Sequence, residues 1–353
     1  MPWTKLVSDP ASRWTQADGP HAEVALSSRI RLARNLDKMP FPHRMSEAQA
    51  AELIRRVEQG VREINLMGLS SKVELFSLAD VPALDRQVLV DKHLISPQQA
   101  TQAYGRAVAV SEDESVSVMV NEEDHLRIQT LLPGLQLEEA WRIASRVDDA
   151  LEQRLDYAFD PKLGYLTSCP TNVGTGLRAS VMMHLPGLVM TQQAGQLFHS
   201  LSQLGLVVRG LYGEGTDATG HIFQISNQTA LGKTEEEIIN HLRGVVQRVI
   251  DAEKQARQHL FRENRIQIED RIGRSYGLLS SARVMSSEEA MKLLSDVRLG
   301  IDLGLFPKLS LRTVNELMVA MQPAFLQRMA GRELSPMERD IRRAALIRSR
   351  LAA

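Results

Sequence analysis

The stretch GLVVRGLYGEGTDATGHIFQISN, residues 205–227, decides the fold expected for the front part of the chain. Its two ends, GLVVRGLY (205–212) and GHIFQISN (220–227), are strand-like runs, and the loop GEGTDAT between them is rich in Gly and Thr. Two runs of this kind on either side of a turn sequence indicate a β-hairpin. The sequence therefore predicts that this part of the chain contributes to a sheet.

Elements on either side of this stretch are predicted to complete a sheet covered by helices. Further strands are predicted at the start of EVALSSRIRLARNL (23–36) and in SVSVMV (115–120), where apolar residues are clustered or alternate. Helices are predicted at 46–64, after the N-cap Ser46, and at 137–155. This mixture of elements favours a sheet with helices packed on it.

The last part of the chain is predicted to be mostly helical. A helix begins at Thr234, because Thr234 and Glu237 can form a capping box and apolar residues at helical spacing follow them. Further N-caps are expected at Ser286 and Ser335. Residues 255–353 hold 17 Lys and Arg against 11 Asp and Glu, so a basic tail follows an acidic front. We expect the boundary between the two regions near residues 255–280.

The composition is that of a globular protein and excludes several classes. The 353 residues include 42 Lys and Arg against 43 Asp and Glu, which excludes a uniformly basic nucleic-acid-binding protein. No apolar run approaches the roughly 18 residues that span a bilayer, and the start MPWTKLVSDPASRW lacks the apolar core of a secretory signal. Cys169 is the single cysteine, so neither an internal disulfide nor structural zinc is expected. We therefore expect a soluble cytoplasmic protein without a nucleic-acid or membrane partner.

A long segment without carboxylates indicates an anion site. Residues 161–213 contain no Asp or Glu over 53 positions, yet they include Arg178 and Arg209. Arginines without nearby carboxylates suit a polyphosphate, because a neighbouring anion would repel the ligand and neutralise the arginines. A buried apolar layer that happens to lack charges would show the same composition. Arg29 and Arg31 are spaced by two residues, so on a strand both point to one face.

Carboxylates elsewhere indicate a site for a cation. Glu122, Glu123 and Asp124 follow a predicted strand directly, and Glu214 lies five residues after Arg209 in the hairpin loop. Adjacent carboxylates repel one another, so a cation or a cationic substrate would stabilise them, although a solvated loop is the alternative. Arginines for an anion and carboxylates for a cation together suggest phosphoryl transfer to a guanidino or amino group, with Mg²⁺ on the phosphates.

Four ordered motifs resemble the catalytic domain of the phosphagen kinases, the arginine and creatine kinase group. They are SSRIRLARN (27–35), VNEEDHLRI (120–128), CPTNVGTGLRASV (169–181) and RGLYGEGTDATGHIFQISNQ (209–228). The first motif already begins at Ser27, and about 100 residues follow the part of the chain that resembles the catalytic domain. In both respects the whole chain resembles the bacterial protein-arginine kinases of that family. The resemblance implies an α+β fold, with an antiparallel, glutamine-synthetase-like sheet flanked by helices in a catalytic domain of residues 1–255, and a helical C-terminal domain of residues 256–353.

The resemblance also implies a nucleotide site. Five residues would contact the ATP phosphates: Arg29, Arg31, Arg127, Arg178 and Arg209. His93 would lie beside the adenine. The remaining residues that would line the nucleotide site are Ser27, Ser28, Ile30, Ala179, Ser180, Val181, Met182, Gly210, Leu211, Tyr212, Gly213 and Glu214.

The same resemblance implies the catalytic groups. Glu123 and Glu214 would hold the guanidinium, one of them accepting its proton, while Glu122 would act nearer the Mg²⁺ through water. A carboxylate pair is needed because a guanidinium is almost never deprotonated in water. Cys169 matches the family's reactive cysteine near the substrate. Its arginine-rich surroundings favour the thiolate, and a buried, inert cysteine is the alternative.

The tail carries the pattern R-D-x-x-R-A at Arg339, Asp340, Arg343 and Ala344. On a helix the two arginines lie on one face with the carboxylate beside them, which matches the charges of phosphoarginine. A solvated, salt-bridged helix is the alternative. The resemblance implies that this motif is a phosphoarginine pocket used in allosteric control.

The resemblance implies a protein-arginine kinase that uses Mg-ATP. Its products would mark proteins for a Clp protease and its unfoldase and would act on a heat-shock repressor in the stress response. A zinc-binding activator protein and a homodimer or higher homo-oligomer are implied as well. Two alternatives remain at this point: a kinase for free arginine or another small guanidine, and a non-catalytic phosphoarginine-binding adaptor. The kinase for free arginine would need an element that closes over a small substrate.

Overall fold

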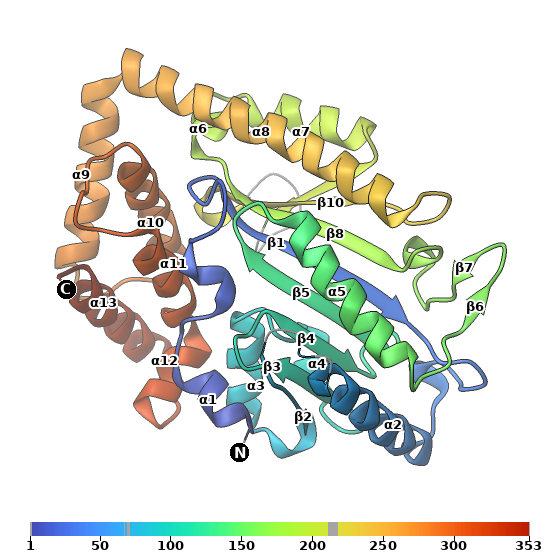
Figure 1. Ribbon diagram of the computed structural model, residues 1–353. Helices are drawn as coiled ribbons and strands as arrows, with labels where there is room; N and C mark the ends of the chain where they lie inside the picture. The colour runs from blue at the N-terminus through green and yellow to red at the C-terminus, as the bar shows by residue number, and fades with distance from the viewer. Residues whose placement is uncertain (1, 67, 69–70, 211–217, 353) are drawn as a thin grey trace.

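An eight-stranded antiparallel sheet forms the centre of the part of the chain described by the computed structural model, residues 2–66, 68, 71–210 and 218–352. Its strand order is β2-β3-β4-β5-β1-β8-β10-β9, and every pairing is antiparallel (Figure 1). The strands are β1 (Ala25–Arg34), β2 (Val73–Ser77), β3 (Ala107–Ser111), β4 (Val116–Val120), β5 (Leu126–Pro133), β8 (Leu177–His184), β9 (Leu206–Gly210) and β10 (Ile222–Asn227). The predicted α+β class is confirmed.

The predicted hairpin is present. Strands β9 and β10 pair with Arg209 opposite Gln224, while residues 211–217 of the connecting loop lie outside the described residues. The strands predicted within 23–36 and at 115–120 are β1 and β4. A separate two-stranded ribbon, β6 (Phe159–Asp160) and β7 (Gly164–Tyr165), precedes the segment of Cys169.

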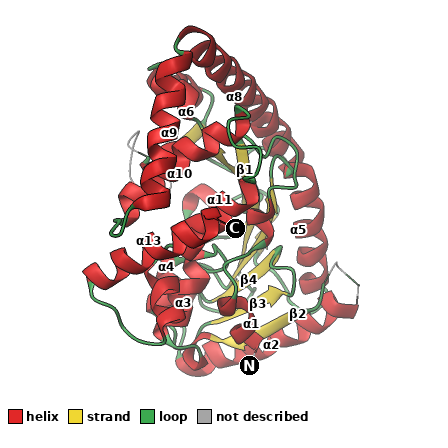
Figure 2. Cartoon of the chain, turned by 90° about the vertical axis from the view of Figure 1, so that its left-hand side faces the viewer, coloured by secondary structure: helices red, strands yellow, loops and turns green. Residues whose placement is uncertain are grey.

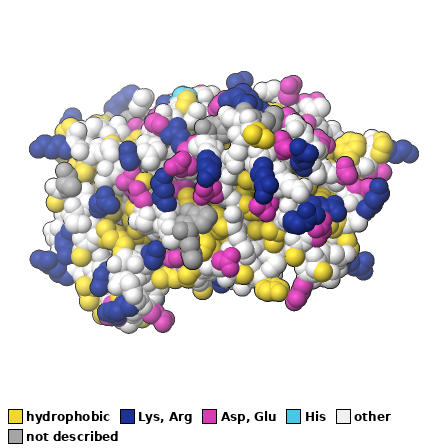
Figure 3. Space-filling view, turned by 60° about the horizontal axis from the view of Figure 1, so that its bottom comes forward, with side chains coloured by type: hydrophobic (Ala, Val, Ile, Leu, Met, Phe, Trp, Pro, Cys, Tyr) yellow, Lys and Arg dark blue, Asp and Glu magenta, His cyan; other side chains and the backbone are white. Residues whose placement is uncertain are grey.

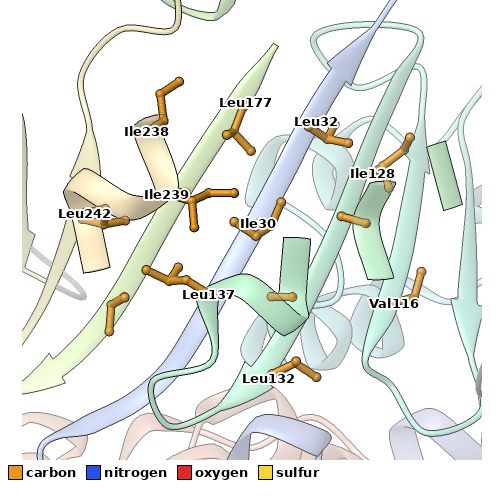
Figure 4. Packing of buried hydrophobic residues seen from close by; sticks show 14 of the residues in the cluster. Ile30, Leu32, Val116, Ile128, Leu132, Leu137, Leu177, Ile238, Ile239 and Leu242 are labelled. Carbon is orange, nitrogen blue, oxygen red and sulfur yellow. The ribbon is translucent and has the colours of Figure 1, made fainter. Parts of the chain in front are cut away.

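One face of the sheet packs on long helices. They are α2 (Glu47–Leu66), α5 (Leu137–Glu152), α6 (Pro186–Met190), α7 (Ala194–Gln203) and α8 (Glu235–Glu263). Figure 4 shows Ile30 and Leu32 of β1 together with Leu137 of α5 and Ile239 of α8 in this apolar layer. Because side chains alternate along a strand, every second residue of β1 is committed to this core.

Helix starts follow the predicted capping signals. Thr234 N donates to Glu237 Oε2 at 2.8 Å and Glu237 N donates to Thr234 Oγ at 3.2 Å, so the capping box of α8 is confirmed. The same arrangement joins Ser335 and Glu338 at the start of α13 (Pro336–Ala352). Helix α8 continues without interruption to Glu263 and thereby carries the chain from the sheet into the tail.

Two adjoining groups of helices pack on the opposite face of the sheet, and Leu346 of α13 contacts the cores of both (Figures 1 and 2). One group packs on β2, β3 and β4 and consists of α1 (Pro2–Ser8), α3 (Ala83–Asp91), α4 (Pro97–Thr101) and α12 (Pro323–Ala330), with the short 3-10 turn η3 (Leu78–Asp80). The other packs on β1, β5, β8 and β10 and consists of α9 (Arg265–Ser281), α10 (Ser287–Asp302), α11 (Leu311–Ala320) and α13, with the 3-10 turn η1 (Arg13–Gln16). The remaining 3-10 turns are η2 (Pro42–Arg44), η4 (Pro170–Asn172) and η5 (Thr219–His221).

Apolar and polar contacts fix the tail to the sheet. Leu26, Leu131, Met182 and Ile222 of the sheet share one buried cluster with the tail helices. Arg298 of α10 is fully buried, and its guanidinium donates to the carbonyl of Glu23 at 2.8 Å and lies 3.1 Å from His184 Nδ1. A buried charge with this many partners is a positioned structural element.

The surface shown in Figure 3 mixes positive, negative and hydrophobic side chains. Among the described residues, no helix is long and apolar enough to cross a membrane.

Candidate active site

Five predicted arginines project from one face of the sheet. Arg29 and Arg31 alternate with the core residues of β1, and Arg31 is the direct antiparallel partner of Arg178 on β8. Arg127 of β5 lies opposite Ala33, and Arg209 of β9 lies opposite Gln224, which in turn faces Met182. Directly paired residues share a face of an antiparallel sheet. Four different strands therefore bring these arginines to the face left free by the long helices.

The arginines are desolvated and repel one another. Burial, together with the charges of neighbouring Arg127 and Arg178, lowers the pKa of Arg29 to about 10. Burial and the same neighbours hold the pKa of Arg31 well below its usual range. The Nε atoms of Arg31 and Arg178 are buried without a hydrogen-bond partner among the described residues. Partnerless donors in a repelling group of cations are typical of a site that an anion completes.

A cavity of about 370 Å³ adjoins this group. It is bounded by Arg29, Arg31, Arg127, His93 and Asp91, together with Gln87, Val90, Ile95, Ser96, Pro97, Met119 and Gln129. Cavities that hold small ligands typically measure roughly 300–1,000 Å³. Arginines line one part of the cavity and apolar and polar groups line the rest, so its size and lining suit a ligand with an anionic and an uncharged part.

His93 is held as a neutral ring at this cavity. Burial, with a smaller contribution from the charge of Arg29, lowers its pKa to about 4. Its backbone lies in the left-handed region at φ 62°, Gln129 Nε2 donates to its carbonyl at 2.8 Å, and its ring lies 5.4 Å from the ring of Trp14. A neutral imidazole fixed in this way offers a flat surface for an adenine.

Asp91 is a second perturbed group in the cavity. Burial raises the pKa of its carboxyl to about 7, and its Oδ2 is without a hydrogen-bond partner among the described residues. The sequence motifs gave no signal for this residue, because its environment comes from α3 packing over the sheet.

The three adjacent carboxylates have different surroundings. Asp124 is structural: Asn35 Nδ2 and the backbone N of Ser168 both donate to its Oδ1 at 2.6 Å. Glu122 is 5 % exposed and accepts a hydrogen bond from Ser96 Oγ at 2.7 Å.

Only Glu123 of the three has a side chain that is substantially exposed, at 38 %. Arg127 Nη2 lies 2.6 Å from Glu122 Oε2 and 2.9 Å from Glu123 Oε2. Arg127 thus joins the arginine group to the two carboxylates, and Glu123 is the one accessible to a substrate. Among the described residues, no group of three or more His, Cys, Asp and Glu is arranged to hold a metal ion.

Cys169 lies at the border of the arginine group. Its charge interaction with Arg178 raises the pKa of that arginine, against the larger lowering by burial and by Arg209. Its Sγ lies 3.1 Å from Thr171 Oγ1, and Asp124 fixes the preceding residue Ser168. The acidic loop, Cys169 and Arg178 are therefore neighbours, as their predicted roles require.

Not every predicted nucleotide residue turns its side chain to this face. Ser27, Ser180 and Met182 border a small cavity next to Arg29 and His93. By contrast, the side chains of Ile30, Ala179 and Val181 belong to the core on the helix side. Ser28 Oγ donates to Gly134 O at 2.8 Å and accepts from Gln136 N at 2.9 Å, so its hydroxyl holds the start of α5.

The hairpin part of the predicted site is described only in part. Gly210 ends β9, whereas Leu211, Tyr212, Gly213 and Glu214 lie outside the described residues. Two residues of β10 that the sequence motifs did not single out contact the arginines. Gln224 Oε1 accepts from Arg29 Nη2, and Ser226 Oγ accepts from Arg178 Nη2 at 3.2 Å. Their alternation with Phe223 and Ile225 was the signal that could have found them.

The predicted tail motif lies on α13. Arg343 is 2 % exposed and donates to the carbonyls of Met321 and Met285, each at 2.9 Å, as well as pairing with Asp340. Ala344 is buried in the tail core. Arg339 is partly exposed and donates to Leu334 O at 3.3 Å. The motif thus has a buried structural arginine and a more accessible one.

Comparisons with known proteins agree with this geometry. The ATP:guanido phosphotransferase C-terminal catalytic domain matches residues 53–256, and the protein-arginine kinase McsB C-terminal domain matches residues 265–353. Among solved structures, the duplicated taurocyamine kinase of Schistosoma mansoni superposes with a TM-score of 0.59 at 26 % identity, over 72 % of this chain and 36 % of that one. A lombricine kinase superposes with a TM-score of 0.56 at 24 % identity, over 70 % and 72 %, and shows the fold.

Curated relatives match over the full length. The chain is 69 % identical over 353 residues to a protein-arginine kinase of Symbiobacterium thermophilum, with 100 % of both chains covered. It is 52 % identical over 346 residues to the protein-arginine kinase of Bacillus subtilis, covering 98 % of this chain and 95 % of that one. The arginine face, the family domains and these full-length relatives together show that the chain belongs to the protein-arginine kinase family of ATP:guanido phosphotransferases.

Proposed function

We propose that this chain transfers the γ-phosphate of ATP, bound with Mg²⁺, to the guanidinium of arginine side chains in proteins. The observation that supports this most is the juxtaposition of partnerless, desolvated arginines with the accessible carboxylate of Glu123. The proposal is also supported by the full-length similarity of the chain to protein-arginine kinases. The reaction needs positioning and charge neutralisation more than covalent chemistry.

The arginine face would bind the phosphates. Arg29, Arg31 and Arg178 gain partners for their donors when three phosphates lie against them, and their mutual repulsion is relieved. His93 would lie beside the adenine. Mg²⁺, when bound on the phosphates, would neutralise charge that builds up during transfer. Glu122 is positioned by Ser96 to hold water close to that end of the site.

The carboxylates would handle the guanidinium. Glu123 would align the target nitrogen, with Glu214, outside the described residues, as the second carboxylate of the pair. The N–P bond forms as the bond from the γ-phosphorus to the bridging oxygen breaks, and the guanidinium proton passes to one carboxylate. Cys169 would lie on the same side as the substrate guanidinium, next to Arg178.

The wider role follows from the family resemblance. Residues 1–255 would form the catalytic domain and residues 256–353 the domain that reads phosphoarginine through Arg339, Asp340, Arg343 and Ala344, and the two family matches support this division. Phosphorylated clients would pass to a Clp unfoldase and protease, and phosphorylation of a heat-shock repressor would link the enzyme to the stress response. A zinc-binding activator and a homodimer or larger homo-oligomer complete the proposal.

Purified protein incubated with Mg-ATP tests the catalytic part. One tube contains an unfolded, arginine-rich protein such as casein and a parallel tube contains free arginine, and phosphosites are mapped under non-acidic conditions that preserve the N–P bond. We expect phosphoarginine in the protein tube. Phosphate on free arginine alone would support a small-guanidine kinase, and phosphate in neither tube would point to a missing activator or to the adaptor.

Glu123→Gln is the variant that tests this carboxylate, because it keeps the size of the side chain and one acceptor oxygen but removes the charge. We expect it to abolish transfer while ATP binding, measured by calorimetry, persists. Loss of ATP binding in this variant would contradict the assignment of Glu123 to the guanidinium.

A further inference from the structure

A second cavity borders the acidic residues Glu122 and Glu123 without being lined by the arginine group. It measures about 450 Å³, and Glu122 and Glu123 line it together with Asn121 and Ser168. The same carboxylates therefore form part of the wall of this cavity and border the arginine face through Arg127. A ligand in this cavity would be in contact with the groups proposed to align the guanidinium.

Two residues that line the cavity have side-chain polar atoms without hydrogen-bond partners among the described residues. Asn121 is 6 % exposed, and its backbone is held in the left-handed region at φ 57°. Its Nδ2 donates to Gly105 O at 2.8 Å, while its Oδ1 accepts no hydrogen bond from the described residues. The hydroxyl of Ser168, which can donate or accept, is the second such group. A ligand with both N–H and C=O groups, such as a polypeptide main chain, could bond to both side chains.

Hydrogen bonds connect the surroundings of this cavity to the acidic residue Glu122. Ser96, the N-cap of α4, donates to Glu122, and Arg106 donates to Gln98 O at 2.9 Å. A side chain at Gly105 would lie 3.3 Å from the Cβ of Ala50, so the loop after α4 packs closely against α2. The cavity is therefore largely preformed, which lowers the entropy lost when a ligand is ordered in it.

The rim of the cavity is open and carries an aromatic side chain. Tyr104 lines the cavity and is 73 % exposed, which is unusual for a large apolar ring. Gln98, Gln102, Pro42 and Met45 also line this cavity. Tyrosine, with adjacent amide groups, is a typical contact for a polypeptide, because the ring packs on side chains and the amides pair with main-chain groups.

We propose that this cavity binds the polypeptide segment that flanks the target arginine in a protein substrate. The arginine side chain points toward Glu123, and the main chain on either side of it crosses the rim along Tyr104. This inference rests on the proposed function, because it assigns a binding site for the polypeptide part of the substrate. It also accounts for how a protein chain reaches Glu123: the rim is open where a free amino acid would need a closing element.

Two substrates separate the arginine from its flanking chain. The first is N-acetyl-arginine methylamide, and the second is a seven-residue peptide with a central arginine among alanines. Phosphoryl transfer to each is measured as kcat and KM at saturating Mg-ATP. We expect the unsubstituted protein to prefer the peptide by about tenfold in kcat/KM, mainly through KM.

Tyr104→Ala tests the rim, and Phe159→Ala is the matched control. Phe159 is also an exposed aromatic residue, at 58 %, but it lies on β6 and does not line the cavity. We expect Tyr104→Ala to raise the peptide KM about five- to tenfold, the usual effect of truncating an aromatic contact residue. The KM of the single-residue substrate should stay within about twofold, and Phe159→Ala should change neither value.

The outcomes distinguish this inference from the proposed function. Equal effects of Tyr104→Ala on both substrates, or an unsubstituted protein that shows no preference for the peptide, would overturn the flanking-chain site and leave the kinase intact. A protein that binds ATP but phosphorylates neither substrate would overturn the proposed function and the inference with it.

Discussion

The partly buried arginines of the active site and the fully buried Arg298 of the tail differ in how completely they are bonded. The Nε atoms of Arg31 and Arg178 have no hydrogen-bond partner among the described residues, and Arg31 lines a cavity. The guanidinium of Arg298, by contrast, is bonded to two backbone carbonyls and lies against His184. A buried donor without a partner is expensive, whereas a saturated one positions its neighbours. The same residue type therefore indicates a ligand site in one place and a structural joint in the other.

Arg298→Met should have the largest effect on stability. It removes the guanidinium that donates to the carbonyls of Ala22 and Glu23 and lies 3.1 Å from His184 Nδ1. Breaking a buried charged network of this kind costs roughly 3–5 kcal/mol, which should be visible in urea unfolding. Arg62→Met, at an exposed helix pair, is the control and should cost less than about 0.5 kcal/mol. If Arg298→Met lowered the free energy of unfolding by less than about 1 kcal/mol, the view of Arg298 as a fully bonded structural residue would be contradicted.

Arg31→Met should show the opposite pattern. Removing one preorganised donor from a transition state typically lowers the rate by about 10²–10³. Because burial and the neighbouring arginines hold the pKa of Arg31 far below its usual range, the charge opposes folding, and its removal should leave the melting temperature unchanged or higher. Rates of phosphoryl transfer and thermal melts of the nucleotide-free protein provide the measurement. A clear drop in melting temperature would mean that Arg31 is a structural arginine.

Asp91→Asn should give a smaller, pH-dependent gain in stability. Burial raises the pKa of Asp91 from 3.8 to about 7, so the folded protein holds this proton between those values while the unfolded chain releases it. The free energy of unfolding of the unsubstituted protein therefore falls as the pH rises through this window, and the penalty is complete above pH 7. We expect a gain on the order of 2 kcal/mol at pH 8 and a smaller one at pH 5, from urea melts. An equal gain in the free energy of unfolding at pH 5 and at pH 8 would contradict the raised pKa of Asp91.

Within the tail motif, Arg339→Ala and Arg343→Ala should differ. Arg343 holds the carbonyls of Met321 and Met285 and is buried, so its loss should cost about 1–3 kcal/mol. Arg339 is partly exposed with one contact to Leu334, and its loss should cost less than about 1 kcal/mol while weakening binding of phosphoarginine in calorimetry. Equal destabilisation by the two substitutions would contradict the assignment of Arg343 as the structural arginine and Arg339 as the accessible one.

The sequence predicted the elements better than the contacts between them. The alternation in β1 placed Arg29 and Arg31 on one face, and the capping box located the start of α8. The meeting of Arg31 with Arg178 could be expected only from the resemblance, because it depends on β1 and β8 being neighbours, which no local pattern encodes. The partners of Arg298 lie near residues 22, 184 and 315, and such long-range pairings are invisible to spacing.

The predicted site was incomplete for the same reason. Asp91 is perturbed by the way α3 packs over the sheet, and the second cavity forms where the loop after α4 meets α2. Ser28 and Ile30 were predicted at the nucleotide site with their neighbours, although strand alternation sends their side chains to the other face. Period-two alternation applied to every motif would have made that distinction.

The apolar contact between the sheet and the tail helices determines how the catalytic domain would behave if it were expressed without the tail. A fragment that ends with α8 at Glu263 would keep all five arginines and the strands that carry them. It would also expose Leu26, Leu131, Met182 and Ile222, which the tail helices bury in the whole chain. A contiguous apolar surface of this kind promotes self-association. We therefore expect the catalytic half produced alone to precipitate during purification, even where each of its strands is correctly paired.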